Sequence, residues 1–299
     1  MTGDVFIIKG IIVLNKPKGK TSHNMISFMR RLTGIKRIGH TGTLDPDATG
    51  VLPICIGKAT RASAYITAED KHYRATVVLG SSTDTYDASG RVTGTSEVLV
   101  SENDIKSAIA YFVGEQEQVP PMYSAIKVGG RKLYELARKG ESVEIAPRRI
   151  TIYSIDVIDI DLENKIVTID VHCSKGTYIR SLCADIGLRL GCLAHMGSLV
   201  RTKTGSFSIE DSYTVEQLEQ MSVDGRLIDA VISLDVVFKD YGRLDLTAEE
   251  ELKVRNGMQI AANGAGDSLL YRLYDSDGKL LCLSKVKDSK LVMETSFWD

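Results

Sequence analysis

The residues best suited to chemistry lie in one short loop near the amino terminus. The stretch from Gly39 to Gly50 contains three glycines, one proline and two aspartates, so it cannot form a regular helix or strand. Its run GHTGTLDP spans Gly39 to Pro46 and contains Asp45, and Asp47 follows directly after Pro46. A carboxylate held in such a loop can act as a nucleophile or as a general base. We therefore expect an ordered or functional loop.

Other chemical motifs fail. Gly57 and Lys58 resemble the end of a phosphate-binding loop, but Leu52 stands where a glycine is required. The acidic run at residues 84–90 lacks the ligand pattern and the closing glutamate of an EF-hand, and we interpret it as a polar turn. No histidine lies in an HExxH motif. The cysteines form no Cys-x-x-Cys pair, so we expect buried, reduced thiols and neither a metal nor a cofactor: Cys55, Cys173, Cys183, Cys192 and Cys282.

Composition restricts the class of protein. A chain of 299 residues with 43% hydrophobic and 25% charged residues can bury a large core in one large domain or two unequal ones. The net charge of −2 hides an uneven distribution, because residues 1–61 hold ten Lys and Arg against three Asp. Residues 204–254 hold twelve Asp and Glu against four Lys and Arg. Local positive charge attracts an RNA backbone, so this asymmetry permits nucleic-acid binding without indicating it alone.

Neither a membrane nor a secretory route is indicated. The longest apolar runs are strand-sized and far from the roughly 20 residues that a membrane-spanning helix needs. The amino-terminal MTGDVFIIKG lacks the basic flank, apolar stretch and cleavage site of a secretory signal. We therefore expect a cytoplasmic protein that does not associate with membranes.

Alternating strands and helices must position the loop. Ile11 to Leu14 predicts a strand, and Ser22 predicts the N-cap of a helix that stops at Gly34. Further strands are expected at 72–79, 149–162, 166–173 and 192–202, and helices at 58–68, after Ser101, near Leu133 and at 176–190. The strand at 149–162 changes phase, which indicates a bulge or a bend. This pattern predicts an α+β domain built on a mixed, mainly antiparallel central sheet with flanking helices.

The carboxyl-terminal 60 residues predict a separate β-rich module. An acidic connector with short helical pieces at 211–235 precedes a helix at 243–255. Strands follow at about 259–262, 269–274, 279–286 and 291–297, with a hairpin loop at 275–278. We expect the domain boundary near residue 240.

Several ordered motifs resemble the bacterial tRNA pseudouridine-55 synthase family, the TruB type. The resemblance covers most of residues 10–205 and rests on GHTGTLDP together with KPKGKTS from Lys16, KHYRA from Lys71, PMYSAIK from Pro121 and GTYIRSL from Gly176. Lys20 stands where relatives commonly carry a hydrophobic residue, and Asp47 stands where they often carry an apolar one. The resemblance implies a pseudouridine synthase fold over residues 1–239, with an RNA-gripping insertion at about 119–148. It also implies a PUA-like β-barrel over 240–299 that touches the tRNA acceptor end.

The resemblance further implies that the chain isomerises uridine 55 in the T-arm of tRNA to pseudouridine and also assists tRNA folding. The N-glycosidic bond breaks, the uracil turns, and the ring rejoins the ribose through C5. The motif assigns the catalytic role to Asp45 and not to Asp47. Attack on C6 of the base, attack on C1′ of the ribose and removal of a sugar proton all remain open. The uridine must first leave its stack in the RNA.

Arg180 and Tyr73 complete the predicted catalytic group. A carboxylate in a largely dry pocket is costly unless a cation compensates it, and a guanidinium can bind it through two hydrogen bonds and lower its pKa. Arg180 is therefore the expected partner of Asp45. Tyr73 is expected to stack on the everted uracil, a contact that contributes roughly 1–3 kcal/mol. The resemblance also places its hydroxyl near C5.

The remaining predicted site residues bind RNA. The resemblance implies that His40 fills the space left by the flipped nucleotide, and that Tyr178 also contacts RNA. Basic side chains of the matched segments are candidates for phosphate contacts: Lys18, Lys20, Arg37, Lys127, Arg131 and Lys132. We expect tRNA as the partner of a monomer that requires neither a guide RNA nor a second protein.

Two alternatives remain. A non-catalytic RNA-binding or RNA-folding protein could keep this architecture, and Asp45→Asn would then leave the pseudouridine yield unchanged. A guide-RNA-dependent synthase of the related archaeal and eukaryotic branch is the other. The long insertion between Pro120 and Pro147 resembles the stand-alone bacterial type instead, and activity on bare transcript separates the two.

Overall fold

The computed structural model describes residues 9–124, 126–137, 139–141, 143–263, 265–266 and 270–298. Some of the sequence predictions fall partly outside these ranges. Eight of the ten residues used to exclude a secretory signal are not described, nor are Ala125 of the PMYSAIK motif and Leu269, the expected first residue of a strand. Among the described residues, no helix has the length and apolar character needed to cross a membrane.

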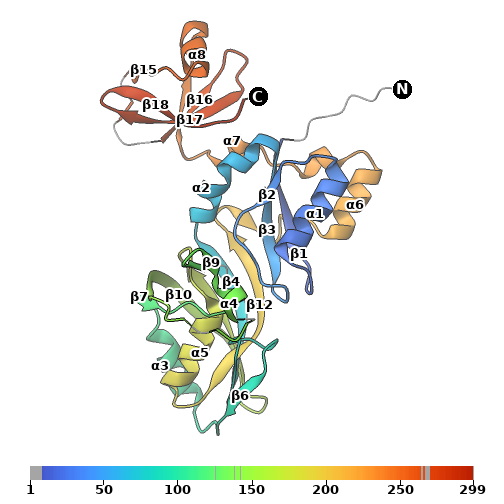
Figure 1. Cartoon of the computed structure of the whole chain (residues 1–299), viewed down its shortest axis with the longest axis vertical. Helices are drawn as coiled ribbons and strands as arrows, with labels where there is room; N and C mark the ends of the chain where they lie inside the picture. The colour runs from blue at the N-terminus through green and yellow to red at the C-terminus, as the bar shows by residue number, and fades with distance from the viewer. Residues whose placement is uncertain are drawn as a thin grey trace.

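One large sheet forms the centre of the molecule (Figure 1). Its strands run in the order β1-β3-β12-β4-β11-β10-β7, with β2 paired to β3 and β13 to β12. Of the described pairs, β3 with β12 is parallel and the others are antiparallel, so the predicted mixed, mainly antiparallel sheet is confirmed. The strands are β1 Gly10–Lys16, β2 Ile38–His40, β3 Thr49–Ile56, β4 Lys71–Leu79, β7 Gly114–Gln118, β10 Arg148–Asp161, β11 Ile166–Cys173, β12 Ala194–Thr204 and β13 Phe207–Ser208.

Helices cover the sheet in two groups. On one half, α3 (Glu102–Ala110) and α5 (Ile179–Arg189) bury their apolar stripes against β4, β10 and β11 in one core. On the other, α1 (Ser22–Thr33) and α6 (Val215–Val223) pack on β1 and β3 in a second core. The five cysteines are buried and free, as predicted.

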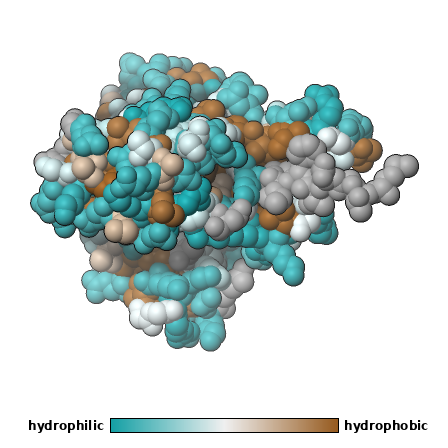
Figure 2. All heavy atoms as spheres, turned by 90° about the horizontal axis from the view of Figure 1, so that it is seen from above, coloured by the Kyte–Doolittle hydropathy of each residue, from teal (hydrophilic) through white to brown (hydrophobic). Residues whose placement is uncertain are grey.

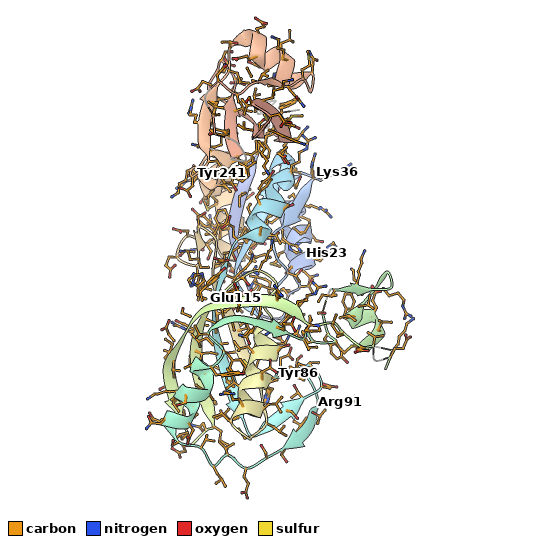
Figure 3. All side chains as sticks on the ribbon, turned by 90° about the vertical axis from the view of Figure 1, so that its left-hand side faces the viewer. His23, Lys36, Tyr86, Arg91, Glu115 and Tyr241 are labelled. Carbon is orange, nitrogen blue, oxygen red and sulfur yellow. The ribbon has the colours of Figure 1, made fainter. Side chains whose placement is uncertain are left out.

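Shorter elements complete the first 240 residues. A 3-10 turn η1 (Gly57–Ala62) leads into α2 (Ser63–Ala68), so the predicted helix at 58–68 is only half α-helical. Two small hairpins are β5–β6 (Ser81–Thr83 and Val92–Thr95) and β8–β9 (Lys127–Val128 and Arg131–Lys132). The β8–β9 hairpin and α4 (Leu133–Ala137) form the insertion, which projects sideways from the body of the molecule in Figure 3. The acidic connector contains α6, η2 (Leu227–Ala230) and α7 (Leu234–Val237).

Three element boundaries were predicted wrongly. The N-cap of α1 is Thr21 and not Ser22, because the Thr21 hydroxyl accepts from the Asn24 backbone in a capping box. The helix expected from residue 176 begins at Ile179, after an extended Tyr178. The predicted phase change in β10 is confirmed by register shifts near Ser154 and Asp159.

The third wrong boundary lies in the carboxyl-terminal part. Residues expected to begin a helix at 243 form strand β14 (Gly242–Asp245), and α8 (Ala248–Arg255) starts only after the Thr247 cap. The Thr247 hydroxyl accepts from the Glu250 backbone, while the Glu250 side chain accepts from the Thr247 backbone. This Thr-x-x-Glu signal is visible in the sequence and marks the true start of the helix.

A second sheet occupies the carboxyl-terminal part, in the order β14-β16-β17-β18-β15. Its other strands are β15 Ile260–Ala261, β16 Leu270–Tyr274, β17 Leu280–Lys287 and β18 Lys290–Ser296. It has its own core, yet Leu283 and Phe297 also pack with Phe238 and with Ile66 of α2. Arg61 donates to the Ser296 carbonyl at 2.8 Å, so both side-chain packing and hydrogen bonds join the two parts. Seen from above in Figure 2, the surface is largely hydrophilic with scattered hydrophobic side chains.

Candidate active site

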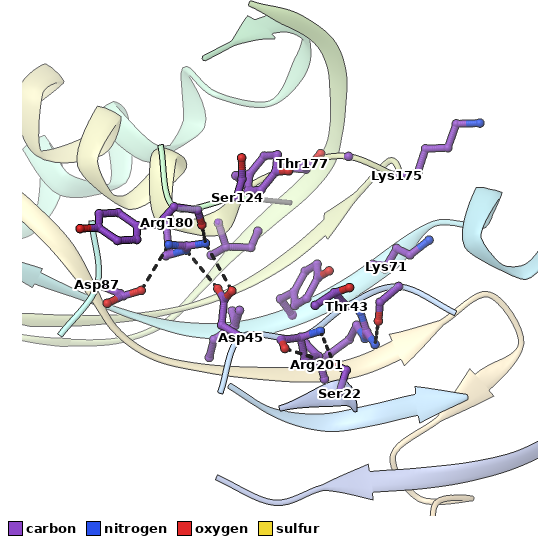
Figure 4. A pocket seen from close by; sticks show the side chains of 18 of the residues that line it. Ser22, Thr43, Asp45, Lys71, Asp87, Ser124, Lys175, Thr177, Arg180 and Arg201 are labelled. Carbon is purple, nitrogen blue, oxygen red and sulfur yellow. Dashed lines mark hydrogen bonds and ion pairs between the residues drawn. The ribbon is translucent and has the colours of Figure 1, made fainter. Parts of the chain in front are cut away.

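A pocket of about 1160 Å³ opens where the loop at residues 41–48 meets β4, β12 and the start of α5 (Figure 4). It collects residues that are far apart in the sequence. Six of the predicted site residues line it: His40, Asp45, Tyr73, Lys132, Tyr178 and Arg180. Five others do not: Lys18, Lys20, Arg37, Lys127 and Arg131.

The loop is held rigidly on both sides of Asp45. Before it, Leu44 is buried in the main core, and its backbone N–H donates to the Ser22 hydroxyl at 3.0 Å. After it, the Pro46 carbonyl accepts from the Lys16 ammonium and from the Gly19 backbone, each at 2.9 Å. Ser22 is free for this contact because it does not cap α1. The carboxylate therefore has a fixed position over the pocket.

Arg180 binds Asp45 through two contacts. Its Nε lies 3.0 Å from Asp45 Oδ2, and one Nη donates to Oδ1 at 3.3 Å. The guanidinium is itself fixed, because it also donates to the carbonyls of Thr85 at 3.2 Å and Tyr123 at 2.8 Å. The Arg180 side chain is 6% exposed and that of Asp45 is 38% exposed. Arg180 therefore contacts the carboxylate on its buried side, and the other side of the carboxylate faces the pocket. The contact between these two side chains is the one that the sequence predicted.

Two opposing effects set the pKa of Asp45. Removal from water raises it, and this effect outweighs the lowering by Arg180, so the net shift is upward. Asp87, a second carboxylate nearby, raises it further. Arg180 lowers this pKa, as the sequence predicted, but the desolvation of a half-buried carboxylate outweighs the effect of one shared guanidinium. Asp47 is exposed and has no ion pair with a described residue, which favours Asp45 as the reactive carboxylate.

Asp87 is a site residue that sequence reasoning missed. It lies in the acidic turn at 84–90, and its Oδ2 is 3.5 Å from Arg180 Nη1. Its Oδ1 accepts from the hydroxyls of Thr85 and Ser89 at 2.7 and 2.6 Å. Tyr86, labelled in Figure 3, has a positive φ of 61° and links the turn to β12 through Met196. The turn was recognised in the sequence, but nothing there connects it to Arg180.

The floor of the pocket contains Tyr73 and Arg201, which lie directly opposite each other on β4 and β12. Arg201 is 1% exposed and received no role from the sequence. Its Nε donates to the Val51 carbonyl at 2.8 Å, and one Nη donates to the Gly42 carbonyl at 3.0 Å. Burial raises the pKa of Tyr73, while the Arg201 charge and a hydrogen bond from its side chain oppose that shift. The only signal in the sequence is the strand alternation, which puts Arg201 in phase with buried Leu199.

The other lining residues form the sides of the pocket. His40 is half-buried, and burial together with the Arg201 charge lowers its pKa. Tyr178 is fixed through its backbone, which exchanges two hydrogen bonds with the Gln118 side chain at 2.8 and 3.0 Å. Lys132 donates to the Tyr134 hydroxyl at 3.3 Å. Besides Arg201, four cations that were not predicted as site residues also line the pocket: Lys71, Arg148, Arg149 and Lys175.

The five predicted residues outside the lining are mostly exposed. Arg37 donates to the Thr60 hydroxyl at 2.7 Å, and Arg131 pairs with Glu141 at 3.2 Å. Lys18 and Lys20 lie on the exposed turn that follows β1, and Lys127 lies on the β8–β9 hairpin. Nothing in the described part of the chain groups three or more His, Cys, Asp or Glu side chains where they could hold a metal ion.

Comparisons with known proteins agree with one another. Residues 30–179 match the TruB family pseudouridylate synthase N-terminal domain, and residues 180–236 match the tRNA pseudouridylate synthase B C-terminal domain. The chain is 40% identical over 285 residues to the tRNA pseudouridine synthase B of Caldanaerobacter subterraneus subsp. tengcongensis, covering 95% of this chain and 97% of the relative. It is 43% identical over 291 residues to the protein of the same name from Clostridium novyi, covering 96% and 99% of the two chains.

Solved structures are similar over nearly the whole chain. One is described as an H/ACA RNP bound to a substrate RNA containing 2'-deoxyuridine; it has a TM-score of 0.74 and 25% identity, covering 98% of this chain and 86% of that one. Another, a Cbf5-Nop10-Gar1 complex, has a TM-score of 0.74 and 27% identity, with the same coverage.

Proposed function

The chain belongs to the TruB family of pseudouridylate synthases, and from this premise we propose that it converts uridine 55 in the T-arm of cytoplasmic tRNA to pseudouridine. It is a tRNA pseudouridine synthase, an isomerase that modifies tRNA. The position of the target uridine, the roles of the individual side chains and the assistance to tRNA folding are the parts that we propose.

The ion pair between Asp45 and Arg180 is the observation that carries the proposal. The carboxylate faces a pocket wide enough for a nucleotide, while the guanidinium holds it from behind. Tyr73 lies on the floor of the same pocket, where its ring can stack on a uracil pulled out of the RNA. We propose that Asp45 reacts with the nucleotide, that Arg180 keeps it ionised, and that His40 fills the space left in the RNA. Nothing in this arrangement selects among attack at C6, attack at C1′ and removal of a sugar proton.

The test is release of tritium from tRNA labelled at C5 of uridine, because isomerisation breaks the C5–H bond. We expect stoichiometric release by the wild-type chain, and release reduced by at least 10⁴-fold, on the order of the loss of a whole catalytic group, for Asp45→Asn. Asp47→Asn should cost less than about tenfold, since that carboxylate lacks the Arg180 contact. Asp229→Asn, at a surface pair with Arg226, is the matched control and should act like wild type.

Position 55 is tested with transcripts in which other uridines are replaced one at a time. Tritium release that persists when only U55 is replaced by cytidine would contradict the proposed target. No release by either the wild-type chain or Asp45→Asn would support the alternative of a non-catalytic RNA-binding protein, whereas retained release by Asp45→Asn would contradict the proposed role of Asp45. Equal tRNA binding by wild type and Asp45→Asn separates loss of chemistry from loss of affinity.

We also propose that the chain acts as a monomer on bare tRNA. One structural relative is an H/ACA RNP and another is a Cbf5-Nop10-Gar1 complex, so dependence on a guide RNA or on a partner protein is the specific alternative. The curated relatives, named tRNA pseudouridine synthase B, support the stand-alone reading. Purified protein with bare transcript decides between them: modification without any addition supports the proposal, and modification only with added RNA or protein contradicts it.

The division of labour along the chain is a further part of the proposal. Residues 1–239 would form the catalytic domain, with the insertion at about 119–148 gripping the RNA. Residues 240–299 would form a PUA-like module, a reading supported by their separate sheet and core. Phosphate contacts are proposed for Lys18, Lys20, Arg37, Lys127, Arg131 and Lys132, to which the lining cations Arg148, Arg149 and Lys175 are added.

A further inference from the structure

Arg201 is a buried cation to which the proposed function assigns no role. Its side chain is 1% exposed, and no described carboxylate forms an ion pair with it. A buried guanidinium is costly unless its donors are satisfied. Here the acceptors are neutral and come from different elements: the Val51 carbonyl on β3 and the Gly42 carbonyl in the loop that carries Asp45. Such an arrangement joins strand and loop around one side chain.

The third neighbour of Arg201 is Tyr73. The two residues are directly opposed in the antiparallel pair of β12 and β4, where side chains on one face have Cβ atoms about 4.5–5.5 Å apart. Both line the pocket, so they share that face. The charge of Arg201 and its guanidinium donors act against the upward shift of the Tyr73 pKa. Since a guanidinium can only donate, the phenolic oxygen is the atom of Tyr73 that can accept from it.

The backbone approaches Arg201 closely at two glycines. A Cβ on Gly50 would lie 2.2 Å from the Arg201 carbonyl, and a Cβ on Gly42 would lie 3.3 Å from Arg201 Nη1. Both glycines have positive φ, 101° and 80°. Gly50 thus lets β3 approach the Arg201 backbone, and Gly42 lets the loop approach the guanidinium.

The charge of Arg201 also reaches its neighbours. Burial and the charge of Arg201 together lower the pKa of Lys71 to about 8. His40 is affected likewise. The lowered pKa values of Lys71 and His40 indicate that no nearby anion among the described residues neutralises the Arg201 charge. This charge therefore favours negative charge on an acceptor that faces it, such as the phenolic oxygen of Tyr73.

We propose that Arg201 is a positioning residue for the isomerisation: it holds the Tyr73 hydroxyl in place from below and ties it, through Gly42, to the loop that carries Asp45. The inference rests on the proposed function. It explains why a charged side chain is buried on the core face of β12, where an apolar residue would otherwise pack. It also makes the two groups that contact the nucleotide, the Asp45 carboxylate and the Tyr73 ring, parts of one hydrogen-bonded unit.

A double-mutant cycle tests the coupling. Arg201→Lys keeps the charge, but a single ammonium nitrogen cannot reproduce the planar fork whose Nε and Nη donors lie at separate positions and reach acceptors on different elements. We expect it to lower the single-turnover rate at least tenfold with Tyr73 present, with tRNA affinity changed less than threefold, and to lower it less than threefold in a Tyr73→Phe background. Equal losses in both backgrounds would mean that Arg201 acts only on the loop or the fold, and the inference would be overturned.

A second measurement needs no turnover. With tyrosine labelled at the ζ carbon, NMR reports the state of each phenol, and Tyr73→Phe identifies the Tyr73 signal. We expect Arg201→Met, or Arg201→Lys if the methionine variant does not fold, to shift that signal; Arg201→Met should also raise its titration midpoint. An unchanged signal overturns the inference even if the wild-type chain proves inactive on tRNA, so the two failures are distinguishable. Arg74→Lys is the matched control: Arg74 follows Tyr73 on β4 but faces away, with its side chain 52% exposed and paired to Asp170 at 2.6 Å, and it should leave both rate and signal unchanged.

Discussion

Replacing Arg180 by methionine should move the acid limb of the pH–rate profile upward. In the proposed reaction Asp45 must be ionised, so activity should rise as pH increases through the pKa of this carboxyl. Burial already raises that pKa above its ordinary value, and Arg180 restrains the rise. Without the guanidinium, a higher pH is needed to ionise Asp45, and the defect should therefore be greatest at low pH.

The size of the shift follows from the geometry. Charges 3.0 Å apart interact by ~5.5 kcal/mol at an effective dielectric constant of about 20 and by ~1.4 kcal/mol in bulk water. Because the Asp45 side chain is 38% exposed, the true value lies between these limits. At about 1.4 kcal/mol per pKa unit, loss of Arg180 should raise the pKa by at least roughly one unit.

The assay is single-turnover tritium release from C5-labelled tRNA between about pH 5 and 9, with enzyme in excess. Arg180→Lys serves as the charge-preserving comparison and should keep the acid limb within half a unit of wild type, although its rate falls. Adding Asp87→Asn to Arg180→Met removes the remaining repulsion and should bring the limb partly back. A uniform loss of rate with an unmoved acid limb would refute the electrostatic role of Arg180.

Two further predictions concern the support of the loop. Ser22→Ala leaves the Leu44 N–H without its partner, and the cost of about 1–3 kcal/mol should appear as a lower melting temperature and a roughly tenfold slower single turnover. Ser63→Ala, at the start of α2, is the control and should change neither quantity. A wild-type rate for Ser22→Ala would show that the loop keeps its position without this contact. Gly50→Ala places a methyl group 2.2 Å from the Arg201 carbonyl oxygen at a φ of 101°, so thermal unfolding should show a free energy of unfolding lower by several kcal/mol, on the order of 3 or more. Gly225→Ala is the control, because Gly225 also has a positive φ but open space around it. Its free energy of unfolding should fall by only about 1 kcal/mol.

The sequence alone determined what depends on neighbours along the chain. The loop around Asp45 was recognisable because its glycines and Pro46 exclude regular structure, and the hairpin of β10 and β11 with its bulge followed from alternation and a polar turn. The pairing of Asp45 with Arg180 also came from the sequence, through motifs that the TruB family shares. The loop and the hairpin depend only on residues that are close in the sequence, whereas the pairing of Asp45 with Arg180 came from the family motifs.

Tertiary structure decided the rest. Arg201 reaches Gly42 across 159 positions of the chain. Sheet pairing sets such contacts, and nothing local in an acidic turn or in one charged strand residue reveals them, which is why Asp87 and Arg201 were missed. The net direction of the Asp45 pKa was likewise invisible, because desolvation depends on everything that surrounds the carboxylate and not on its one recognised partner.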